Sequence, residues 1–290
     1  MTEKTPRAVS VTMLKGGVGK STIAGNLAET LANRGHDVLF MDLDSLGHAS
    51  EGLGFGDHYL NFDTHLGEVL FNSKDPTDVT YETGFGFDIL PKTNNHDTIR
   101  NQIKEAEMPS LQLKNKFIDP LLGDEYDYII IDNSGDKTVL LNNSLVAAEN
   151  VIIPVTPGEE SIHGLKRTKE DLLKPLRNYI DLKVLAIVPN KIKERIDYDN
   201  DHRKLVELIN RGSPSKTPNF ARITPEEWDA LDNGEWEGPN PTPGIRQNSD
   251  FSDAYGEKKP LRAYNPDNPE LENLEELAQI VEQGGIKHEQ

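Results

Sequence analysis

Lys15-Gly16-Gly17-Val18-Gly19-Lys20-Ser21-Thr22 is the most informative segment of this chain. It follows a β-branched apolar run, residues 8–13, and opens a helical pattern over residues 20–34. Glycines at such a junction let backbone N–H groups turn inward around a phosphate, and the N-terminus of the helix adds its positive end. A glycine-rich turn without a ligand is the alternative. The order of strand, Gly-Lys-Ser and helix instead predicts a phosphate-binding loop.

The side chains of this loop have separate expected roles. Lys20 is expected to lie against the β- and γ-phosphates of a nucleotide, and the hydroxyl of Ser21 is expected to bind Mg²⁺. The full nucleotide-binding set predicted for the loop is Lys15, Gly16, Gly17, Val18, Gly19, Lys20, Ser21 and Thr22.

Short apolar runs alternate with longer helical patterns along the rest of the chain, which is typical of parallel strands joined by crossover helices. The expected strands are 8–13, 37–42, 87–91, 126–132, 150–156 and 182–189. The expected helices are 20–34, 64–71, 98–106, 139–149, 162–179, 202–210 and 271–283. Several strands are apolar nearly throughout, as strands covered on both faces must be. We therefore predict an α/β fold with a doubly wound, mostly parallel sheet and helices on both faces.

Residues 211–244 have a different composition from their surroundings. They combine two tryptophans, Trp228 and Trp236, with acidic residues and with prolines at 214, 218, 225, 239, 241 and 243. Such a segment is typical of a loop-rich insertion, and it is too short for an independent core. We predict one domain over residues 1–290, with a loop-rich insertion at about 211–244.

The overall composition excludes several functional classes. The 290 residues contain 31 basic and 49 acidic side chains, a formal charge of −18, which argues against a generally basic nucleic-acid coat protein. The absence of cysteine excludes a disulfide scaffold, a thiolate metal site and a cysteine nucleophile. No apolar stretch approaches the roughly 20 residues of a membrane span, so we expect a cytoplasmic protein.

Two expected strands end in carboxylates. Asp42 ends the strand expected at 37–42, Asp44 follows it, and Asp132 ends the apolar run at 126–132. Carboxylates at the carboxyl ends of parallel strands face the crevice where a doubly wound sheet binds its ligand. The second run has the form of a Walker B segment, in which Asp132 is expected to hold a Mg²⁺-bound water.

The loop departs from the general phosphate-loop pattern because Leu14 occupies the first glycine position and Lys15 is added. In this form it resembles the deviant Walker A loop of the ParA/MinD family of ATPases, which are P-loop NTPases. The resemblance implies that Lys15 reaches across an ATP-sandwich homodimer to the phosphates of the partner. A lysine acting in this way makes dimerisation depend on the γ-phosphate. A merely solvated Lys15 is the alternative.

Residues 42–48 resemble the family's first switch. The resemblance implies that Asp44 orients or activates the attacking water and that Asp42 belongs to the Mg²⁺ shell, although Ser45, Leu46 and His48 replace the usual proline, glutamine and asparagine. The predicted catalytic residues are therefore Lys15, Lys20 and Asp44, and the predicted metal-binding residues are Ser21, Asp42 and Asp132. The family also implies that Asn190 contacts the adenine edge, with a turn-forming asparagine as the alternative.

The resemblance implies an ATPase that hydrolyses slowly and depends on Mg²⁺. The iron-sulfur carriers of the superfamily need cysteine, and MinD-like proteins use a basic amphipathic C-terminal helix, whereas residues 271–290 are mainly acidic. ParA-type partitioning ATPases remain, whose ATP dimers bind nonspecific DNA and whose hydrolysis is stimulated by a centromere-binding, ParB-like partner. Because the first strand is expected at about residue 8, we expect the type without an N-terminal helix-turn-helix.

DNA affinity would then have to come from the ATPase body. Residues 166–204 carry eleven basic and seven acidic side chains, a local charge of +4, and Arg246 and Arg262 are further candidates. We therefore expect nonspecific DNA binding and nucleoid association without membrane attachment. The alternative is a nucleotide-gated, MinD-like positioning scaffold for a protein cargo that binds no DNA.

Overall fold

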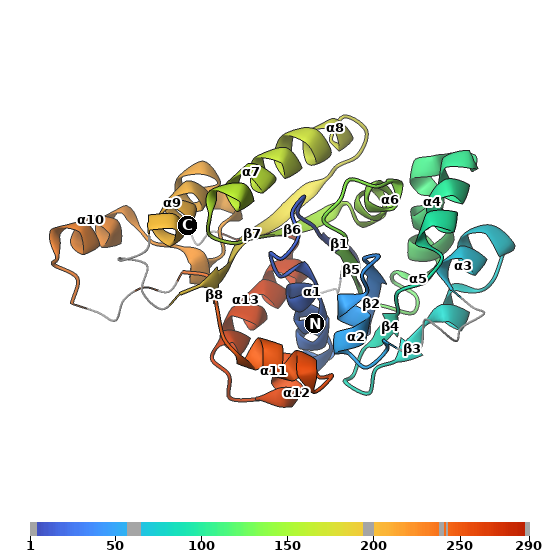
Figure 1. Ribbon diagram of the computed structural model, residues 1–290, viewed down its shortest axis with the longest axis horizontal. Helices are drawn as coiled ribbons and strands as arrows, with labels where there is room; N and C mark the ends of the chain where they lie inside the picture. Colours follow the sequence, from blue (N-terminus) through green and yellow to red (C-terminus); the bar gives the residue numbers. More distant parts are fainter. Residues whose placement is uncertain (1–4, 57–64, 194–199, 238–240, 242, 288–290) are drawn as a thin grey trace.

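The computed structural model describes residues 5–56, 65–193, 200–237, 241 and 243–287. An eight-stranded sheet has the order β3-β4-β2-β5-β1-β6-β7-β8, and helices cover both of its faces (Figure 1). Its strands are β1 (Arg7–Val11), β2 (Val38–Leu43), β3 (Tyr81–Glu82), β4 (Asp88–Leu90), β5 (Tyr128–Asn133), β6 (Asn150–Val155), β7 (Lys183–Ile192) and β8 (Ile245–Arg246). Only the β3–β4 pair is antiparallel among these neighbours, which confirms the predicted sheet.

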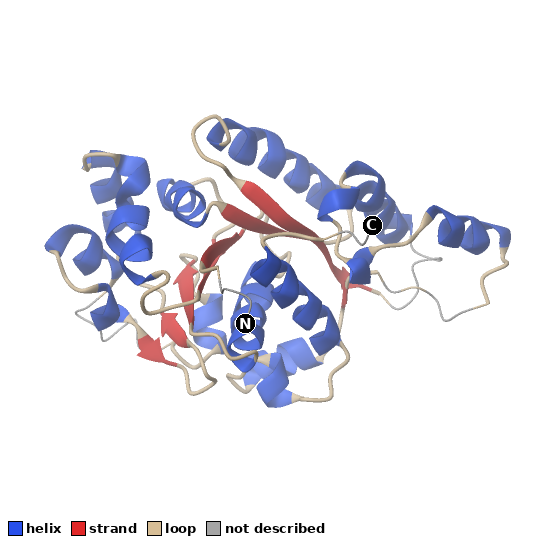
Figure 2. Cartoon of the chain, turned by 180° about the vertical axis from the view of Figure 1, so that it is seen from behind, coloured by secondary structure: helices blue, strands red, loops and turns tan. Residues whose placement is uncertain are grey.

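The α-helices connect the strands or follow them (Figure 2). They are α1 (Lys20–Asn33), α2 (His48–Gly52), α3 (Leu66–Asn72), α4 (His96–Glu105), α5 (Asp119–Leu121), α6 (Val139–Ala148), α7 (Glu159–Arg167), α8 (Lys174–Leu176), α9 (Asn200–Gly212), α10 (Pro225–Asn233), α11 (Asp250–Gly256), α12 (Leu261–Tyr264) and α13 (Glu270–Gln283). Short 3₁₀ segments span Pro76–Val79, Pro109–Leu111, Pro214–Lys216 and Asn219–Ala221. Two π-helical segments span Lys114–Ile118 and Thr168–Leu173, and the second joins α7 to α8. Position 64 of the helix expected at 64–71 lies outside the described residues.

The central strands are buried on both faces, as their apolar composition predicts. On β5, Ile130 packs in the cluster that contains α1 and α13, whereas Ile129 and Ile131 pack in the cluster that contains α3, α4 and α6. Successive side chains of a strand point to opposite faces, so one apolar run serves two helical layers. The edge strands β3 and β8 were not expected, because two residues carry no periodicity that a sequence pattern can show.

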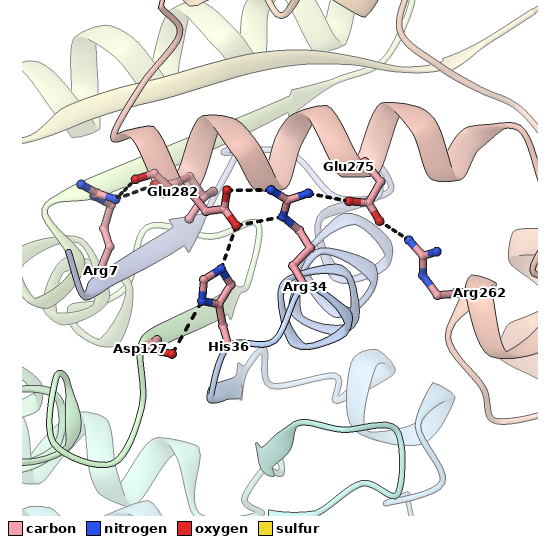
Figure 3. A network of polar contacts seen from close by, with 8 residues as sticks. Arg7, Arg34, His36, Asp127, Arg262, Glu275 and Glu282 are labelled. Carbon is pink, nitrogen blue, oxygen red and sulfur yellow. Dashed lines mark hydrogen bonds and ion pairs between the residues drawn. The ribbon is translucent and has the colours of Figure 1, made fainter. Parts of the chain in front are cut away.

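Helix α13 lies against α1 and is fastened there by a polar network (Figure 3). Arg34 donates to both carboxylate oxygens of Glu282 at 2.8 Å and to Glu275 at 3.0 Å, and Arg262 donates to the other oxygen of Glu275. Hydrogen bonds from Arg34 hold the pKa of Glu282 below its usual range. The other side of the helix is apolar and buried, so the acidic C-terminal segment packs as part of the core.

In the described part of residues 211–244, loops and 3₁₀ segments accompany one helix that the sequence analysis did not predict. This helix is α10, which begins with a capping box between Thr224 and Glu227 and has Pro225 in its first turn. Trp228 of this helix is buried, and Arg203 of α9 stacks 4.8 Å from its ring. The proline count concealed a helix whose start signal, Thr-Pro-Glu-Glu, is present in the sequence. The one-domain organisation over residues 1–290 remains a prediction.

Glu29, a buried carboxylate of α1, predicts a pH-dependent stability. Burial raises the pKa of Glu29 to about 7, against opposing contributions from Arg262 and from backbone N–H groups at Arg262 and Ala263. The unfolded chain ionises this group near its ordinary value of 4.5, so the folded state loses stability as the pH rises from about 4.5 to 7. Ionisation then costs at most about 3 kcal/mol above pH 7.

We therefore expect Glu29→Gln to raise the free energy of unfolding by about 1–3 kcal/mol at pH 8 and by less at pH 5. Urea unfolding of the nucleotide-free protein at both pH values measures this difference. Glu272→Gln, a substitution of an exposed acid on α13, is the matched control. A gain from Glu29→Gln that is equal at the two pH values would contradict the assignment to ionisation.

Candidate nucleotide-binding site

The loop between β1 and α1 has the backbone that a phosphate-binding loop requires. Gly17 and Gly19 have φ values of 75° and 87°, a region that favours glycine, and Gly19 is the N-cap of α1. A cavity of about 490 Å³ lies over the loop and is lined by its glycines, by Lys20 and Ser21, and by Asp44. The structure therefore brings the predicted phosphate ligands and the predicted catalytic aspartate to one cavity.

Lys20 is buried in this site, and its ammonium group donates to the backbone carbonyl of Lys15 at 3.1 Å. Burial lowers the pKa of Lys20, whereas the charges of Asp132 and Asp44 act in the opposite direction. The ammonium group of Lys20 therefore lies near the carboxylates of Asp132 and Asp44 in the nucleotide-free chain. This arrangement suits a polyphosphate, whose oxygens can accept the remaining hydrogen bonds of the Lys20 ammonium group.

Asp132 lies at the carboxyl end of β5, and its role as a metal ligand remains a prediction. The parallel register pairs Asp132 with Asp42 on β2 and with Val11 on β1, next to the start of the loop. Asp132 is fully buried, and among the described residues neither of its carboxylate oxygens accepts a hydrogen bond of good geometry, although the hydroxyl of Ser21 is near enough to oppose the rise of its pKa. Burial, followed by the charge of Asp42, raises the pKa of Asp132 well above its usual range. Two unpaired buried oxygens beside Ser21 fit a hydrated Mg²⁺ ion, which binds through one or two carboxylates and phosphates.

Asp42 is engaged differently from the metal ligand that the family resemblance implies. Its Oδ2 accepts hydrogen bonds from the backbone N–H and the hydroxyl of Ser50 at 2.8 and 2.6 Å, and its Oδ1 accepts from the N–H of Asp44 at 3.1 Å. Burial raises the pKa of Asp42 to about 6, and these hydrogen bonds oppose the rise. In this geometry Asp42 fixes the turn that carries Asp44, and its place in a Mg²⁺ shell remains a prediction.

Asp44 is held at the edge of the cavity. Its Oδ1 accepts the N–H of Leu46 at 3.0 Å, and its side chain is largely buried. The following turn ends at Gly47, which begins α2 in a left-handed conformation. A carboxylate with one oxygen fixed by the backbone and the cavity beside it suits a group that orients water.

Lys15 points toward α7 of its own chain. Its ammonium group lies 3.1 Å from the hydroxyl of Ser161 and 3.4 Å from a carboxylate oxygen of Glu160. The side chain of Glu160 is 90% exposed, so this ion pair is weak and exchanges easily with another anion. The sequence did not show that the first residues of α7 would receive this lysine.

The segment at the carboxyl end of β5, Asn133-Ser134-Gly135-Asp136, approaches the phosphate loop closely. Gly135, which follows β5, leaves so little space that an added Cβ would meet the backbone of Lys15 and Gly16 at 3.0 Å. Asn133 is buried and donates to the hydroxyl of Ser10 at 2.9 Å. This segment is thus packed against the loop, and the close approach at position 135 favours glycine, which has no side chain.

Asn190 reaches the phosphate loop and not an open surface. Its Nδ2 donates to the carbonyl of Val18 at 2.8 Å, and its Oδ1 accepts the N–H of Lys191 at 2.9 Å. Asn190 also borders a second cavity, of about 1030 Å³, together with Arg246 of β8 and with Phe251 and Tyr255 of α11. This cavity is the candidate nucleoside pocket, and the adenine contact of Asn190 remains a prediction.

Comparisons with known proteins agree with this fold. A family model described as AAA domain matches residues 6–182. An uncharacterised protein of Methanocaldococcus jannaschii is 34% identical over 199 residues, which cover 64% of this chain and 74% of that protein. The chromosome partitioning protein ParA of Myxococcus xanthus is 31% identical over 185 residues, which cover 63% of this chain and 64% of ParA. The structure of an McdA variant from Cyanothece with ATP aligns with a TM-score of 0.77 and 19% identity over 99% of this chain and 100% of that one.

Proposed function

The chain belongs to the ParA/MinD family of P-loop ATPases, within the AAA-domain family that matches residues 6–182, and from this we propose that it is an ATP-dependent dimerising switch in DNA partitioning. In this proposal the ATP-bound homodimer binds nonspecific DNA, hydrolyses ATP slowly, and is stimulated by a centromere-binding, ParB-like partner. The similarity to a chromosome partitioning protein supports the biological role.

The observation that supports the ATPase part is that Lys20 and Asp44 line the cavity over the phosphate loop, while the buried Asp132 lies close enough to Lys20 to act on its pKa. Lys20 and the loop N–H groups bind the phosphates, and Ser21 and Asp132 hold Mg²⁺. Mg²⁺ neutralises phosphate charge when it is bound. Asp44 orients the attacking water, and Asp42 positions Asp44 through the backbone hydrogen bond described above.

The proposed dimerisation step is an exchange of partners by Lys15. In the isolated chain Lys15 lies on Ser161 and the exposed Glu160. A triphosphate on a second protomer offers a stronger, multiply charged acceptor, so Lys15 leaves α7 only when ATP is present across the interface. This gives the nucleotide control over assembly.

The DNA-binding part depends on the basic segment 166–204. Arg195 lies outside the described residues. Lys166 is exposed on α7, while Arg167 donates to the carbonyl of Leu14 and so joins this face to the start of the phosphate loop. Arg246 and Arg262 pair with Glu270 and Glu275, which reduces their availability to DNA. Contacts to phosphates are therefore proposed chiefly for α7 and its continuation.

A protein-cargo scaffold remains the second candidate, because one feature favours it. Carboxylates of this chain pair with four cations of the basic segment, namely Lys174, Lys183, Arg203 and Lys204. Exposed pairs of this kind are weak and can be replaced by DNA phosphates, but their presence lowers the positive charge that is available to DNA.

In the described ranges no helix has the length and apolar character needed to cross a bilayer. The acidic α13, whose apolar side is buried, supports the proposal that the protein acts without membrane attachment. We further propose that it acts in the cytoplasm, near the nucleoid.

Binding to random duplex DNA tests the two candidates. We expect retardation with ATP and Mg²⁺ but not with ADP, an affinity that falls at least tenfold between 50 and 200 mM salt, and loss of binding for Lys20→Ala. Solution mass measured with ADP, ATP and a nonhydrolysable analogue reports dimerisation in the same samples. An ATP-dependent dimer that ignores DNA even at low salt would favour the scaffold.

A further inference from the structure

Lys191 has an unusual position at the carboxyl end of β7. Its φ is 57°, a left-handed conformation that lysine rarely adopts, and its ammonium group donates to the carbonyl of Gly17 at 2.9 Å. The preceding residue, Asn190, donates to the next carbonyl of the loop, that of Val18. Two consecutive side chains of β7 therefore donate hydrogen bonds to the carbonyls of two consecutive residues of the phosphate loop.

These two hydrogen bonds fix the directions in which the N–H groups of the loop point. In a planar trans peptide the N–H is antiparallel to the C=O. Because the carbonyls of Gly17 and Val18 point to Lys191 and Asn190, the N–H groups of Val18 and Gly19 point away from β7. Anion binding by a glycine-rich loop depends on such preset N–H directions.

Lys191 also lies at the border of the two cavities. It lines the cavity over the phosphate loop together with Lys20, and it lines the candidate nucleoside pocket together with Arg246 and Phe251. A nucleotide that occupies both must pass this border where its ribose joins its phosphates. The ammonium group is exposed and carries three donors, only one of which the carbonyl of Gly17 requires.

We propose that Lys191 is a nucleotide-positioning residue that holds the phosphate loop together with Asn190 and supplies a cation where the nucleoside meets its phosphates. The inference rests on the proposed ATP-binding function. Lys191 acts within its own chain and on parts of the nucleotide that ADP and ATP share. It therefore differs from Lys15, whose proposed role needs the γ-phosphate and a partner. The left-handed backbone is retained because it aims the side chain at the loop.

Binding of ADP and ATP to the full chain, measured by calorimetry with Mg²⁺ at protein concentrations below dimerisation, tests this inference. We expect Lys191→Met to weaken both nucleotides equally, by about tenfold, because one charge-assisted contact is lost from each complex. The affinity of this variant should also depend less on salt, and Lys191→Arg should restore most of the loss. Lys104→Met, at an exposed position of α4, is the matched control for net charge.

Lys191→Gly separates the side chain from the backbone, since glycine adopts the left-handed conformation freely. It should lose as much affinity as Lys191→Met, while thermal unfolding without nucleotide reports whether either variant is misfolded. Wild-type affinity for ADP in both variants, or a loss confined to ATP, would overturn the inference while leaving the ATPase proposal intact. A wild-type chain that binds neither nucleotide would remove both.

Discussion

Asp44→Ala is expected to bind ATP normally, to dimerise, and to hydrolyse ATP at least 100-fold more slowly than the wild type. The side chain of Asp44 lines the cavity beside Lys20, and one of its oxygens is already fixed by the N–H of Leu46. Removing the carboxylate takes away the proposed water-orienting group and leaves the phosphate loop in place. Single-turnover hydrolysis and solution mass with ATP measure the two halves of this expectation.

Asp124→Ala, which changes an exposed acid in the turn before β5, is the control and should hydrolyse ATP as the wild type does. Asp44→Asn keeps the side-chain shape and its acceptor oxygen but removes the charge. If it is as slow as Asp44→Ala, the charge is needed for more than positioning. Hydrolysis at the wild-type rate by Asp44→Ala would show that another group prepares the water.

Lys15→Gln is expected to abolish ATP-driven dimerisation while leaving ADP binding by the monomer within about threefold of the wild type. In a two-fold dimer the substitution removes two charge-assisted contacts. At about 1.5–3 kcal/mol for each contact, the dimerisation constant should fall by at least 100-fold. In the isolated chain the ammonium group of Lys15 meets Ser161 and the exposed Glu160 at the start of α7, so removing this group costs the monomer little stability.

Sedimentation with ADP, ATP and a nonhydrolysable analogue measures the expected difference, with Lys104→Gln as the charge control. Dimerisation of Lys15→Gln with ATP at the wild-type concentration would exclude a role for Lys15 in trans. A parallel loss of ADP binding would instead place Lys15 in the nucleotide site of its own chain, with no need for a partner.

The six strands expected from the sequence and the phosphate loop were predictable because the sequence patterns that indicate them are local. An apolar run such as residues 126–132 carries its own periodicity, and the glycines and lysines of residues 15–22 carry their own backbone requirement. The helix α10 had a local signal too, the capping box at Thr224, which the surrounding prolines obscured. The strands β3 and β8 had none, since they form only because a neighbour offers an unpaired edge.

The candidate site was predictable in its residue types and less so in its contacts. Asp132 is buried beside Ser21, whereas Asp42 accepts hydrogen bonds from Ser50 and Asp44, and the metal-binding roles of both aspartates remain predictions. Asn190 donates to the loop carbonyl of Val18, a contact that the sequence did not show, and its predicted contact with adenine remains a prediction. Lys191 was not singled out, because a lysine after a strand is ordinary until its left-handed backbone and its partner are seen.

The sequence by itself determined the chemistry that this protein carries: a polyphosphate loop, the acids that face it and the alternating order of strands and helices. Those features depend on neighbours within a few positions, and their spacing is written in the chain. Only the tertiary structure decided which residues the side chains of the candidate site contact. Lys15 meets Ser161 and Asn190 meets Val18 across 146 and 172 positions, and no local spacing encodes such contacts, since they arise when parallel strands bring their carboxyl ends together.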